Sequence, residues 1–425
     1  MMQVYKFGGA SIATPERMRQ LLPIIQQTKE PLVIVVSALG KTTNALEDIV
    51  SHACLGEKEE ALKLATDLID NHINFASVLL VDVYKSQAKE KIISFSDELK
   101  AAIGKASGSK YDFSYDQIVC IGELLSTAIF NAFLLQEGFP FQWVDVRSII
   151  STDDTFRDAR VLWKVSEKKA KEILQPFLLS GKNIITQGFI GRSDSGASVT
   201  LGREGSDYTA AMLAAMLGAS AVTIWKDVEG LLNADPKLFS NTVKIEAITY
   251  HEVIEMSYYG AQVIHPKTIK PLQNSKIPLY VKCFLKPELK GTIIQNEVDS
   301  MFYPPLIVLK KNQILLQVTT RDFSFVTEDN LRHLYGIFHE LKIKVNLIQN
   351  AAISFVACID HAEDKVHALI NRLSEDYRVF RNENAELLTI RHYTPEVLQD
   401  LTRRRFILLE QKTRHTVQVL MSGQS

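Results

Sequence analysis

Residues 200–210 read T-L-G-R-E-G-S-D-Y-T-A, a turn with two glycines and an arginine that leads into a helix. Gly202 and Gly205 can adopt backbone conformations that other residues avoid. Arg203 lies between them and supplies a guanidinium, which binds a carboxylate or phosphate group through two parallel hydrogen bonds. The stretch therefore predicts an anion-binding turn at the start of a helix, with phosphate as the expected occupant.

The helix after this turn is predicted over residues 208–217, with Ser206 or Asp207 as its cap. A Ser-Asp pair alone is typical of an ordinary helix start, and only the glycines and the arginine favour a binding site. Residues 208–225 carry no charge, which meets the length criterion for a membrane span. Because the run is rich in alanine and breaks at residues 218–220, a buried helix followed by a buried strand explains it better.

A second glycine turn lies near the N-terminus, where Gly8 and Gly9 follow a strand expected over residues 4–7. Lys6 precedes the two glycines, and a lysine at such a turn can reach phosphate oxygens while backbone N–H groups bind the others. A helix is expected to begin near Thr14, with proline in its first turn. The K-F-G-G pattern is a weak signal by itself, so its weight comes from its pairing with the glycine turn at residues 200–210.

Strand-like and helix-like runs alternate up to about residue 295, which indicates an α/β fold: a mostly parallel sheet with helices on both faces. Because ligands bind at the carboxyl ends of strands in such sheets, the turns that follow the strands should converge on one edge. The further strands are expected at residues 32–36, 141–144, 183–186, 222–225 and 279–281, and helices at residues 61–81, 122–135 and 160–179.

Residues 290–305 interrupt this alternation with glycine, a polar stretch and two prolines, which predicts a linker. Beyond it, runs in the order β-α-β-β predict α+β modules of the ferredoxin-like type. We expect a catalytic domain over residues 1–295 and a regulatory region over residues 306–425. That region is expected to hold a first module at residues 312–382 and a partial second module, without its last helix and strand, at residues 385–421.

The composition is that of a globular protein: 425 residues, 46% hydrophobic and 23% charged, with a net charge of −1. No basic excess indicates nucleic-acid binding, and the N-terminus lacks the apolar segment of a signal peptide. The chain is therefore expected to be cytoplasmic, with no membrane and no nucleic acid among its partners. Reduced core thiols, rather than disulfides or metal ligands, are expected at Cys54, Cys120, Cys283 and Cys358, which show no C-x-x-C spacing.

Seven motifs can be picked out along residues 2–295: K-F-G-G-A-S from Lys6, V-S-A-L-G-K-T-T-N from Val36, G-E-L-L-S-T from Gly122, G-F-I-G from Gly188, T-L-G-R-E-G-S-D-Y-T-A-A from Thr200, K-D-V-E-G-L-L-N-A-D-P from Lys226 and Y-G-A-Q-V-I-H-P from Tyr259. Together, and in this order, they resemble the motifs of aspartate kinases in the amino acid kinase superfamily. The region after residue 295 is more weakly similar to paired ACT regulatory domains. Sister families that act on N-acetylglutamate, glutamate or UMP share the glycine turns, but the S-A-L-G-K-T-T-N turn, Glu123 and G-R-E-G-S-D are similar to the aspartate enzymes.

This resemblance implies a kinase that transfers the γ-phosphoryl group of ATP, bound with Mg²⁺, to the side-chain carboxylate of L-aspartate. The product, 4-phospho-L-aspartate, starts lysine, threonine and methionine synthesis, and the Mg²⁺ is carried by ATP without direct protein ligands. The implied catalytic residues are Lys6, Gly8, Gly9 and Asp207. The implied substrate-binding residues are Thr43, Glu123, Arg203 and Ser206. The implied nucleotide-binding residues are Lys6, Phe7, Gly8, Gly9, Lys226, Asp227, Leu232, Lys237 and Gln262.

Four positions depart from the family's usual pattern. Leu232 stands where tyrosine is common, Lys237 where arginine is common, and Gln262 where lysine is common. Relatives often have glycine at Glu204, and the sequence gives no reason for a carboxylate beside an anion site. Two other functions stay open: a non-catalytic amino-acid sensor on a degraded kinase fold, and a kinase for another acidic amino acid.

The ACT-like region implies a homodimer or a higher homo-oligomer that binds lysine or threonine as an effector. The positions matched to the lysine pocket of lysine-sensitive relatives carry no carboxylate for the effector's ammonium, so lysine inhibition is expected to be weak or absent. Those positions are Asn346, Asn350, Ala351 and Ala352.

Overall fold

The computed structural model describes residues 2–261, 264–298, 303–322 and 324–423. The chain divides into two compact units, which we call the N-terminal and the C-terminal unit. Two segments from the middle of the sequence, 232–243 and 255–261, group with the C-terminal unit. The N-terminal unit comprises Met1–Leu231, Lys244–Ile254 and Gln262–Met301, and the C-terminal unit comprises Leu232–Val243, Glu255–Ala261 and Phe302–Ser425.

The N-terminal unit is built on an eight-stranded sheet in the order β11-β13-β12-β8-β1-β2-β5-β3. All neighbouring strands run parallel except β12 and β13, which are antiparallel. The α/β fold with a mostly parallel sheet is therefore confirmed, as are the six strands expected from the sequence. The strands are β1 (Gln3–Phe7), β2 (Leu32–Val36), β3 (Phe141–Val144), β5 (Asn183–Gln187), β8 (Ala221–Lys226), β11 (Ala247–Thr249), β12 (Leu279–Cys283) and β13 (Thr292–Gln295).

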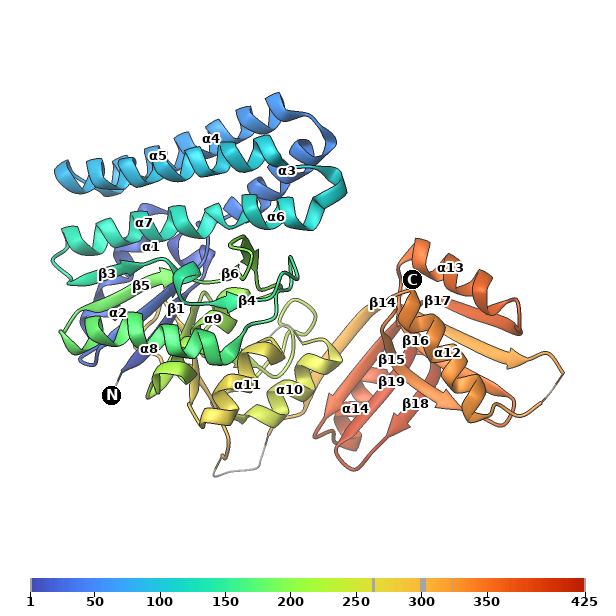
Figure 1. Cartoon of the computed structure of the whole chain (residues 1–425). Helices are drawn as coiled ribbons and strands as arrows, with labels where there is room; N and C mark the ends of the chain where they lie inside the picture. Colours follow the sequence, from blue (N-terminus) through green and yellow to red (C-terminus); the bar gives the residue numbers. More distant parts are fainter. Residues whose placement is uncertain (1, 262–263, 299–302, 323, 424–425) are drawn as a thin grey trace. The chain divides into compact units, whose positions relative to one another are not determined.

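Helices cover both faces of this sheet (Figure 1). Helix α7 packs on one face, with α4 and α5 stacked outside it, and α8 and α9 pack on the other face. Each helix that was expected from periodicity is present. The helices are α1 (Pro15–Gln20), α2 (Leu22–Gln26), α3 (Thr42–Leu55), α4 (Lys58–Leu79), α5 (Asp82–Lys105), α6 (Tyr111–Val119), α7 (Ile121–Gln136), α8 (Trp163–Leu179), α9 (Gly205–Leu217), α10 (Tyr250–Tyr259) and α11 (Pro266–Ser275), with short 3₁₀ turns at Gly9–Ile12, Gly108–Lys110 and Val146–Ser148.

The sheet is buried between these layers, which explains its continuous apolar strands. Every residue of β2 is buried, and on β1 Phe7 is fully buried and stacks on Trp225 of β8 at 6.4 Å. Among the described residues, the helical run Gly108–Gln136 has the length and composition of a membrane span, but 89% of its 18-residue apolar stretch is buried inside the protein. Residues 208–225 form α9 and β8, as expected from the break at Gly218.

Two local expectations were wrong. Residues 292–295, expected to be linker, form β13, because Thr292 and Ile294 are buried while the strand pairs with β11 and β12. A small three-stranded sheet was also missed, since its strands are too short to show an alternating pattern. It consists of β4 (Ser151–Thr152), β6 (Ile190–Ser193) and β7 (Ser198–Thr200), and the short strands β9 (Leu231–Leu232) and β10 (Lys244–Ile245) were not expected either.

The C-terminal unit contains a six-stranded antiparallel sheet in the order β15-β16-β14-β17-β19-β18. One 15-residue strand, β17, runs across the boundary that was expected between the two modules at residues 382–385, and it pairs with the equally long β14. The elements are β14 (Leu306–Thr320), α12 (Glu328–Glu340), β15 (Val345–Asn350), β16 (Ser354–Asp360), α13 (Glu363–Leu373), β17 (Tyr377–Arg391), α14 (Pro395–Thr402), β18 (Ile407–Lys412) and β19 (Thr416–Ser422).

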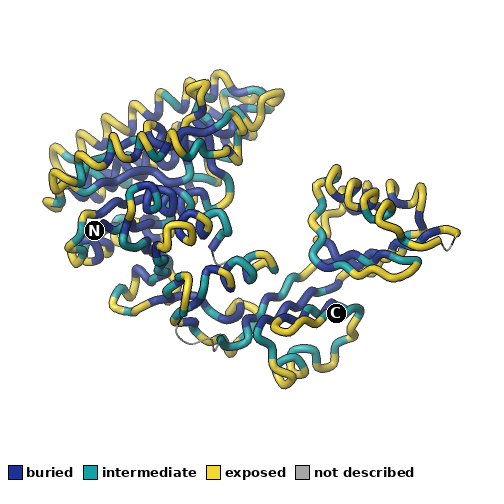
Figure 2. Tube along the Cα trace, turned by 60° about the horizontal axis from the view of Figure 1, so that its bottom comes forward, coloured by how far each residue is buried: buried dark blue, intermediate teal, exposed yellow. Residues whose placement is uncertain are grey.

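The two long strands join two packing regions into one sheet. Around α12 and α13, one face buries a cluster that includes Leu316, Phe338 and Phe355, while Leu388 and Val419 belong to a cluster against α14. Figure 2 shows the buried residues of this unit in dark blue and its exposed residues in yellow. Gln411 on β18 donates a hydrogen bond to the carbonyl of Ile348 on β15, so the two edge strands approach each other and the sheet curls into a half-barrel. This is the α+β fold expected for ACT-like modules.

Candidate active site

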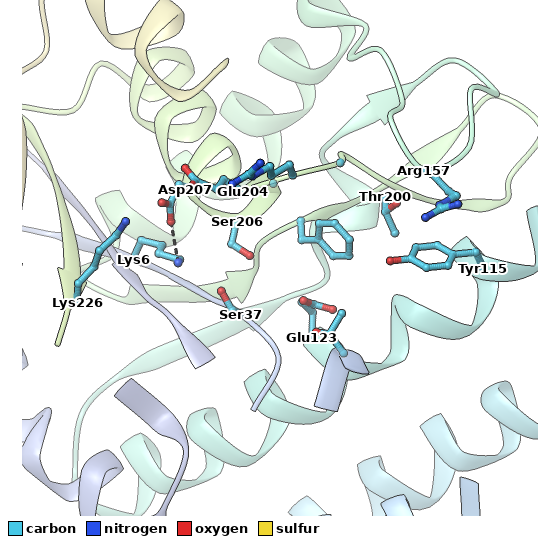
Figure 3. Close-up of a pocket in the computed structure, with 15 residues that line it drawn as sticks. Lys6, Ser37, Tyr115, Glu123, Arg157, Thr200, Glu204, Ser206, Asp207 and Lys226 are labelled. Carbon is cyan, nitrogen blue, oxygen red and sulfur yellow. Dashed lines mark ion pairs between the residues drawn. The ribbon is translucent and has the colours of Figure 1, made fainter. Parts of the chain in front are cut away.

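A cavity of about 480 Å³ opens in the N-terminal unit where strands β8, β1, β2 and β5 end (Figure 3). These four strands are neighbours in the sheet, so the turns after them converge as the parallel arrangement requires. Seven residues expected at the site line this cavity: Lys6, Thr43, Glu123, Arg203, Ser206, Asp207 and Lys226. Eight more residues line it: Ser37, Tyr115, Arg157, Phe189, Thr200, Gly202, Glu204 and Gly205.

Lys6 and Asp207 form a nearly buried ion pair at one end of the cavity. The Lys6 Nζ lies 2.7 Å from Asp207 Oδ1, and the two side chains are only 11% and 5% exposed. Lys6 is held rigidly because its strand position pairs with Val35 on one side and Ile224 on the other. The pair therefore presents one ammonium and one carboxylate at fixed positions, with little competition from water.

The turn after β1 brings two strand ends into close contact. A Cβ on Gly9 would lie 2.7 Å from the Ala38 carbonyl oxygen, so only glycine fits there. The Gly40 N–H donates to the Gly9 carbonyl at 3.2 Å, which ties this turn to the turn after β2. A Cβ on Gly8 would lie 3.4 Å from Lys6 Nζ, so the lysine amine lies directly beside the glycine turn.

Helix α9 begins earlier than its sequence indicated, and the expected cap by Ser206 or Asp207 was wrong. Glu204 precedes the helix in the left-handed conformation (φ 54°) and makes no side-chain cap, so Gly205 is the first helical residue. The next two side chains are thereby placed in the first helical turn, where both line the cavity.

Glu204 gains an explanation from the fold. Its backbone conformation, with φ 54°, is one that glycine adopts without strain and that residues with a side chain seldom adopt. Its carboxylate accepts a hydrogen bond from the backbone N–H of His265 at 2.8 Å, at the start of α11. The side chain therefore stabilises a neighbouring helix start.

Close packing fixes the position of Ser206. A Cβ on Gly188 would lie 2.4 Å from the Ser206 Cβ, so the turn after β5 can pass the helix only because residue 188 is glycine. A Cβ on Gly205 would in the same way meet the Phe189 ring at 2.7 Å. The start of α9 is thus clamped against the strand ends.

Glu123, on the first turn of α7, is a buried carboxyl group with one oxygen that has no hydrogen-bond partner among the described residues. Its Oε1 accepts the backbone N–H of Ala38 at 3.2 Å, while Oε2 has no hydrogen-bond partner among the described residues. Burial raises the pKa of Glu123 to about 8, although the Ala38 N–H and the charge of Lys6 act in the opposite direction. An unpartnered buried carboxyl oxygen facing a cavity is suited to bind a cation.

Thr43 lies on the first turn of α3, beside a buried hydrogen-bonded pair. Thr42 Oγ1 lies 3.3 Å from His72 Nε2, and the other ring nitrogen of His72 contacts the Leu68 carbonyl at 2.7 Å. A protonated Nδ1 is required for the Leu68 bond, so Nε2 accepts from the threonine hydroxyl. Burial lowers the pKa of His72, which keeps the ring neutral and this pairing intact.

Sequence reasoning missed the far end of the cavity, which Tyr115, Arg157 and Thr200 line. Behind them, the fully buried carboxylate of Asp116 accepts hydrogen bonds from the Arg157 N–H and from the N–H and hydroxyl of Thr200, at 2.7–3.0 Å. Burial raises the pKa of Asp116 to about 6. The only signal in the sequence was a carboxylate, Asp116, one residue after Tyr115 in the run Tyr111–Val119.

Of the described residues expected to bind the nucleotide, only Lys6 and Lys226 are among those that line the cavity. Lys226 lines the cavity at the end of β8, and Asp227 follows it on the surface. The side chain of Phe7 lies in the core of the sheet, so this residue can offer only its backbone to a ligand. Leu232 and Lys237 belong to the C-terminal unit, and Gln262 lies outside the described residues.

The remaining histidine, cysteine and carboxylate groups form no candidate metal site within the described ranges. No group of three or more histidine, cysteine, aspartate or glutamate side chains there could hold a metal ion. The four cysteines are free thiols, with Cys54 half-buried and the other three buried. Burial raises the pKa of Cys120 to about 12, so that thiol is unreactive.

The chain is similar to known proteins over most of its length. Residues 1–283 match the Amino acid kinase family. Lysine-sensitive aspartokinase 3 of Escherichia coli is 34% identical over 361 residues, which is 84% of this chain and 78% of that protein. The crystal structure of E. coli aspartokinase III with aspartate and ADP superimposes with a TM-score of 0.83 at 29% identity, covering 100% of this chain and 96% of that one. The structure of the same enzyme with lysine and aspartate gives a TM-score of 0.81 at 29% identity, covering 99% and 96%.

Proposed function

The chain belongs to the aspartokinases of the amino acid kinase family, and from this premise we propose how its cavity carries out their reaction. It is an aspartate kinase, which transfers the γ-phosphoryl group of ATP to the side-chain carboxylate of L-aspartate. The product is 4-phospho-L-aspartate, a mixed anhydride that begins the synthesis of lysine, threonine and methionine. We assign the individual steps from the contacts at the cavity.

The attacking carboxylate needs no general base. A free aspartate side chain has a pKa of about 3.9, so it is already ionised at neutral pH. Catalysis must then come from bringing two anions together and from stabilising the charge on the transferred group. A site for this reaction needs fixed cations at one end and a selective pocket for the amino acid at the other.

At the phosphoryl end, we assign Lys6 and the N–H groups of Gly8 and Gly9 to the γ-phosphate. The lysine amine lies beside the glycine turn, so one ammonium and the backbone donors can bind the same group. Asp207 keeps the amine in position through the 2.7 Å ion pair. Its carboxylate could also accept a hydrogen bond from a water molecule bound to the Mg²⁺ that accompanies ATP. That ion, when bound, neutralises phosphate charge.

At the amino-acid end, we assign Arg203 to the α-carboxylate of aspartate, since a guanidinium binds a carboxylate in two-pronged fashion. Glu123 would take the α-ammonium through its unpartnered Oε2. Hydroxyl groups of Thr43 and Ser206 complete this pocket. In this arrangement aspartate enters as a dianion with an ammonium, and each of its groups meets a protein group of suitable charge.

For the nucleotide, we propose that Lys226 and Asp227 lie along the phosphates and ribose, with backbone contribution from Phe7. Contacts from Leu232, Lys237 and Gln262 stay predictions, as does the effect on ATP affinity of their departures from the family pattern. We further propose that the enzyme works in the cytoplasm as a homodimer or higher homo-oligomer formed through its ACT-like region. The catalytic domain is assigned to residues 1–295 and the regulatory region to residues 306–425.

The observation that carries this proposal is that Lys6 with Asp207, Glu123 and Arg203 line one cavity. The test is a coupled assay of ADP formation, together with ATP-dependent hydroxamate formation, on L-aspartate, L-glutamate and N-acetyl-L-glutamate. Activity confined to aspartate supports the proposal. Activity only on another acid would contradict it, and the absence of all activity would favour an amino-acid sensor.

Two substitutions test the assigned roles. Lys6→Ala should lower kcat by about 10²- to 10³-fold, the cost of losing one preorganised donor to the developing charge. Arg203→Ala should mainly raise the KM for aspartate. As a control, Arg192→Ala changes an exposed arginine on β6 outside the cavity and should leave both constants unchanged. Full activity in either cavity variant would remove the role assigned to that residue.

A further inference from the structure

Arg157 lies at the end of the cavity opposite the Lys6–Asp207 pair (Figure 3). It occupies the loop before α8 and adopts the left-handed backbone conformation, with φ 67°. That conformation is uncommon for a residue with a side chain and persists where the surroundings enforce it. The surroundings of Arg157 therefore hold its backbone in this conformation while the residue lines the cavity.

The strain is maintained by a buried anchor. Asp116 is fully buried, and its Oδ2 accepts the N–H of Arg157 at 2.9 Å and the N–H of Thr200 at 3.0 Å. One carboxylate thus ties the loop to the end of β7, which also lines the cavity. This anchor sets the backbone of Arg157 at the edge of the cavity whatever its side chain does.

The side chain has a platform but only a weak ionic partner. The guanidinium carbon lies 4.4 Å from the centre of the Tyr115 ring, and the Tyr115 hydroxyl is held by Glu47 at 2.7 Å. The ion pair with Asp112 measures 3.3 Å, with side chains 48% and 64% exposed. An exposed pair of this kind contributes little, so a better anion in the cavity can displace it.

Resting on the function proposed above, we propose that Arg157 is a second guanidinium for the α-carboxylate of aspartate, acting together with Arg203. The reacting carboxylate must lie at the opposite end, next to Lys6 and the phosphoryl group. The α-carboxylate is then the anionic group of the substrate directed toward Tyr115, Thr200 and Arg157. With two arginines around it, the α-carboxylate must carry its negative charge for the substrate to bind well. Arg157 would therefore determine specificity for substrates with a free α-carboxylate.

The test compares L-aspartate with its α-amide, L-isoasparagine, which keeps the reacting carboxylate but lacks the α-carboxylate charge. Arg157→Gly removes the guanidinium and relaxes the backbone, since glycine adopts positive φ freely. We expect its KM for aspartate to rise about 10- to 100-fold, the usual effect of losing a charge-assisted hydrogen bond. Its kcat and its KM for ATP should stay within about twofold, and its kcat/KM for the α-amide should not change. The KM of Arg157→Lys for aspartate should lie between those of the unmodified enzyme and Arg157→Gly.

The matched control is Arg160→Ala, an exposed arginine three residues along the same loop that does not line the cavity. It should behave as the unmodified enzyme. Equal losses for aspartate and its α-amide, or a lower melting temperature in Arg157→Gly, would show a structural role and overturn the inference. Unchanged kinetics with both substrates would overturn it as well.

Direct binding keeps this inference separate from the proposed function. Titration calorimetry of L-aspartate and L-isoasparagine in the presence of a non-hydrolysable ATP analogue reports affinity without turnover. Loss of the charge-assisted hydrogen bond should weaken the affinity of Arg157→Gly for aspartate about 10- to 100-fold. That result would support the role of Arg157 even if the enzyme proves inactive on aspartate. Equal affinities in the two proteins would refute it even if the aspartate kinase activity is confirmed.

Discussion

The buried carboxyl group of Glu123 makes the affinity for aspartate dependent on pH in a direction that can be worked out. Burial raises its pKa to about 8, so below that pH the ligand-free enzyme holds it in the neutral, protonated form. Only the carboxylate can pair with the α-ammonium of aspartate, so binding must release a proton at neutral pH. The KM for aspartate should therefore fall as the pH rises through about 8.

The size of the effect follows from the ionised fraction. With a pKa of about 8, roughly one tenth of Glu123 is ionised at about pH 7 and roughly nine tenths at about pH 9. The KM for aspartate should thus decrease about tenfold over this range. The value of kcat at saturating aspartate should change little, because the bound substrate keeps the carboxylate ionised.

The assay is a pH series of initial rates, with ADP formation measured at saturating ATP in buffers of constant ionic strength. Glu123→Gln should show a raised KM that no longer changes with pH in this range. Glu204→Gln is the matched control, because this carboxylate also lines the cavity but bonds to the His265 N–H, and the pH dependence should persist. A KM that is flat with pH in the unmodified enzyme, or a tenfold change that survives in Glu123→Gln, would refute the reasoning.

Three other outcomes are expected. Asp207→Asn should lower kcat by about 10²-fold or more and shift the melting temperature downward, because it leaves the buried Lys6 charge unpaired; retention of full kcat would contradict the positioning role. Gly188→Ala should displace the start of α9, since its Cβ would lie 2.4 Å from that of Ser206; we expect loss of aspartate binding by calorimetry, and unaltered affinity would show that the turn can move. Lysine should inhibit ADP formation weakly or not at all, because Asn346 stands at a matched effector position and its amide is already bonded to Gln313 and Asp360 at 2.9 Å; inhibition at sub-millimolar lysine would refute this.

Local signals were sufficient for the framework of the site. Apolar runs of strand length and helices of 3.6-residue period predicted the central strands and helices, and the two glycine turns predicted where ligands gather. Seven expected residues, from Lys6 to Lys226, do line one cavity. This succeeded because in a parallel sheet the carboxyl ends of strands must lie at one edge, so the position of a turn in the sequence already places it in space.

The sequence by itself therefore determined the fold class, the glycine turns and the charged residue types that line the cavity. Only the tertiary structure decided how those groups are tuned, because burial and close packing arise from segments distant in sequence. The raised pKa of Glu123 depends on enclosure between α7 and the turn after β2. Packing and hydrogen bonds that no local pattern encodes likewise set three further features. These are the start of α9 at Gly205, the hydrogen bond from the His265 N–H to Glu204 at the start of α11, and the position of Arg157 at the cavity.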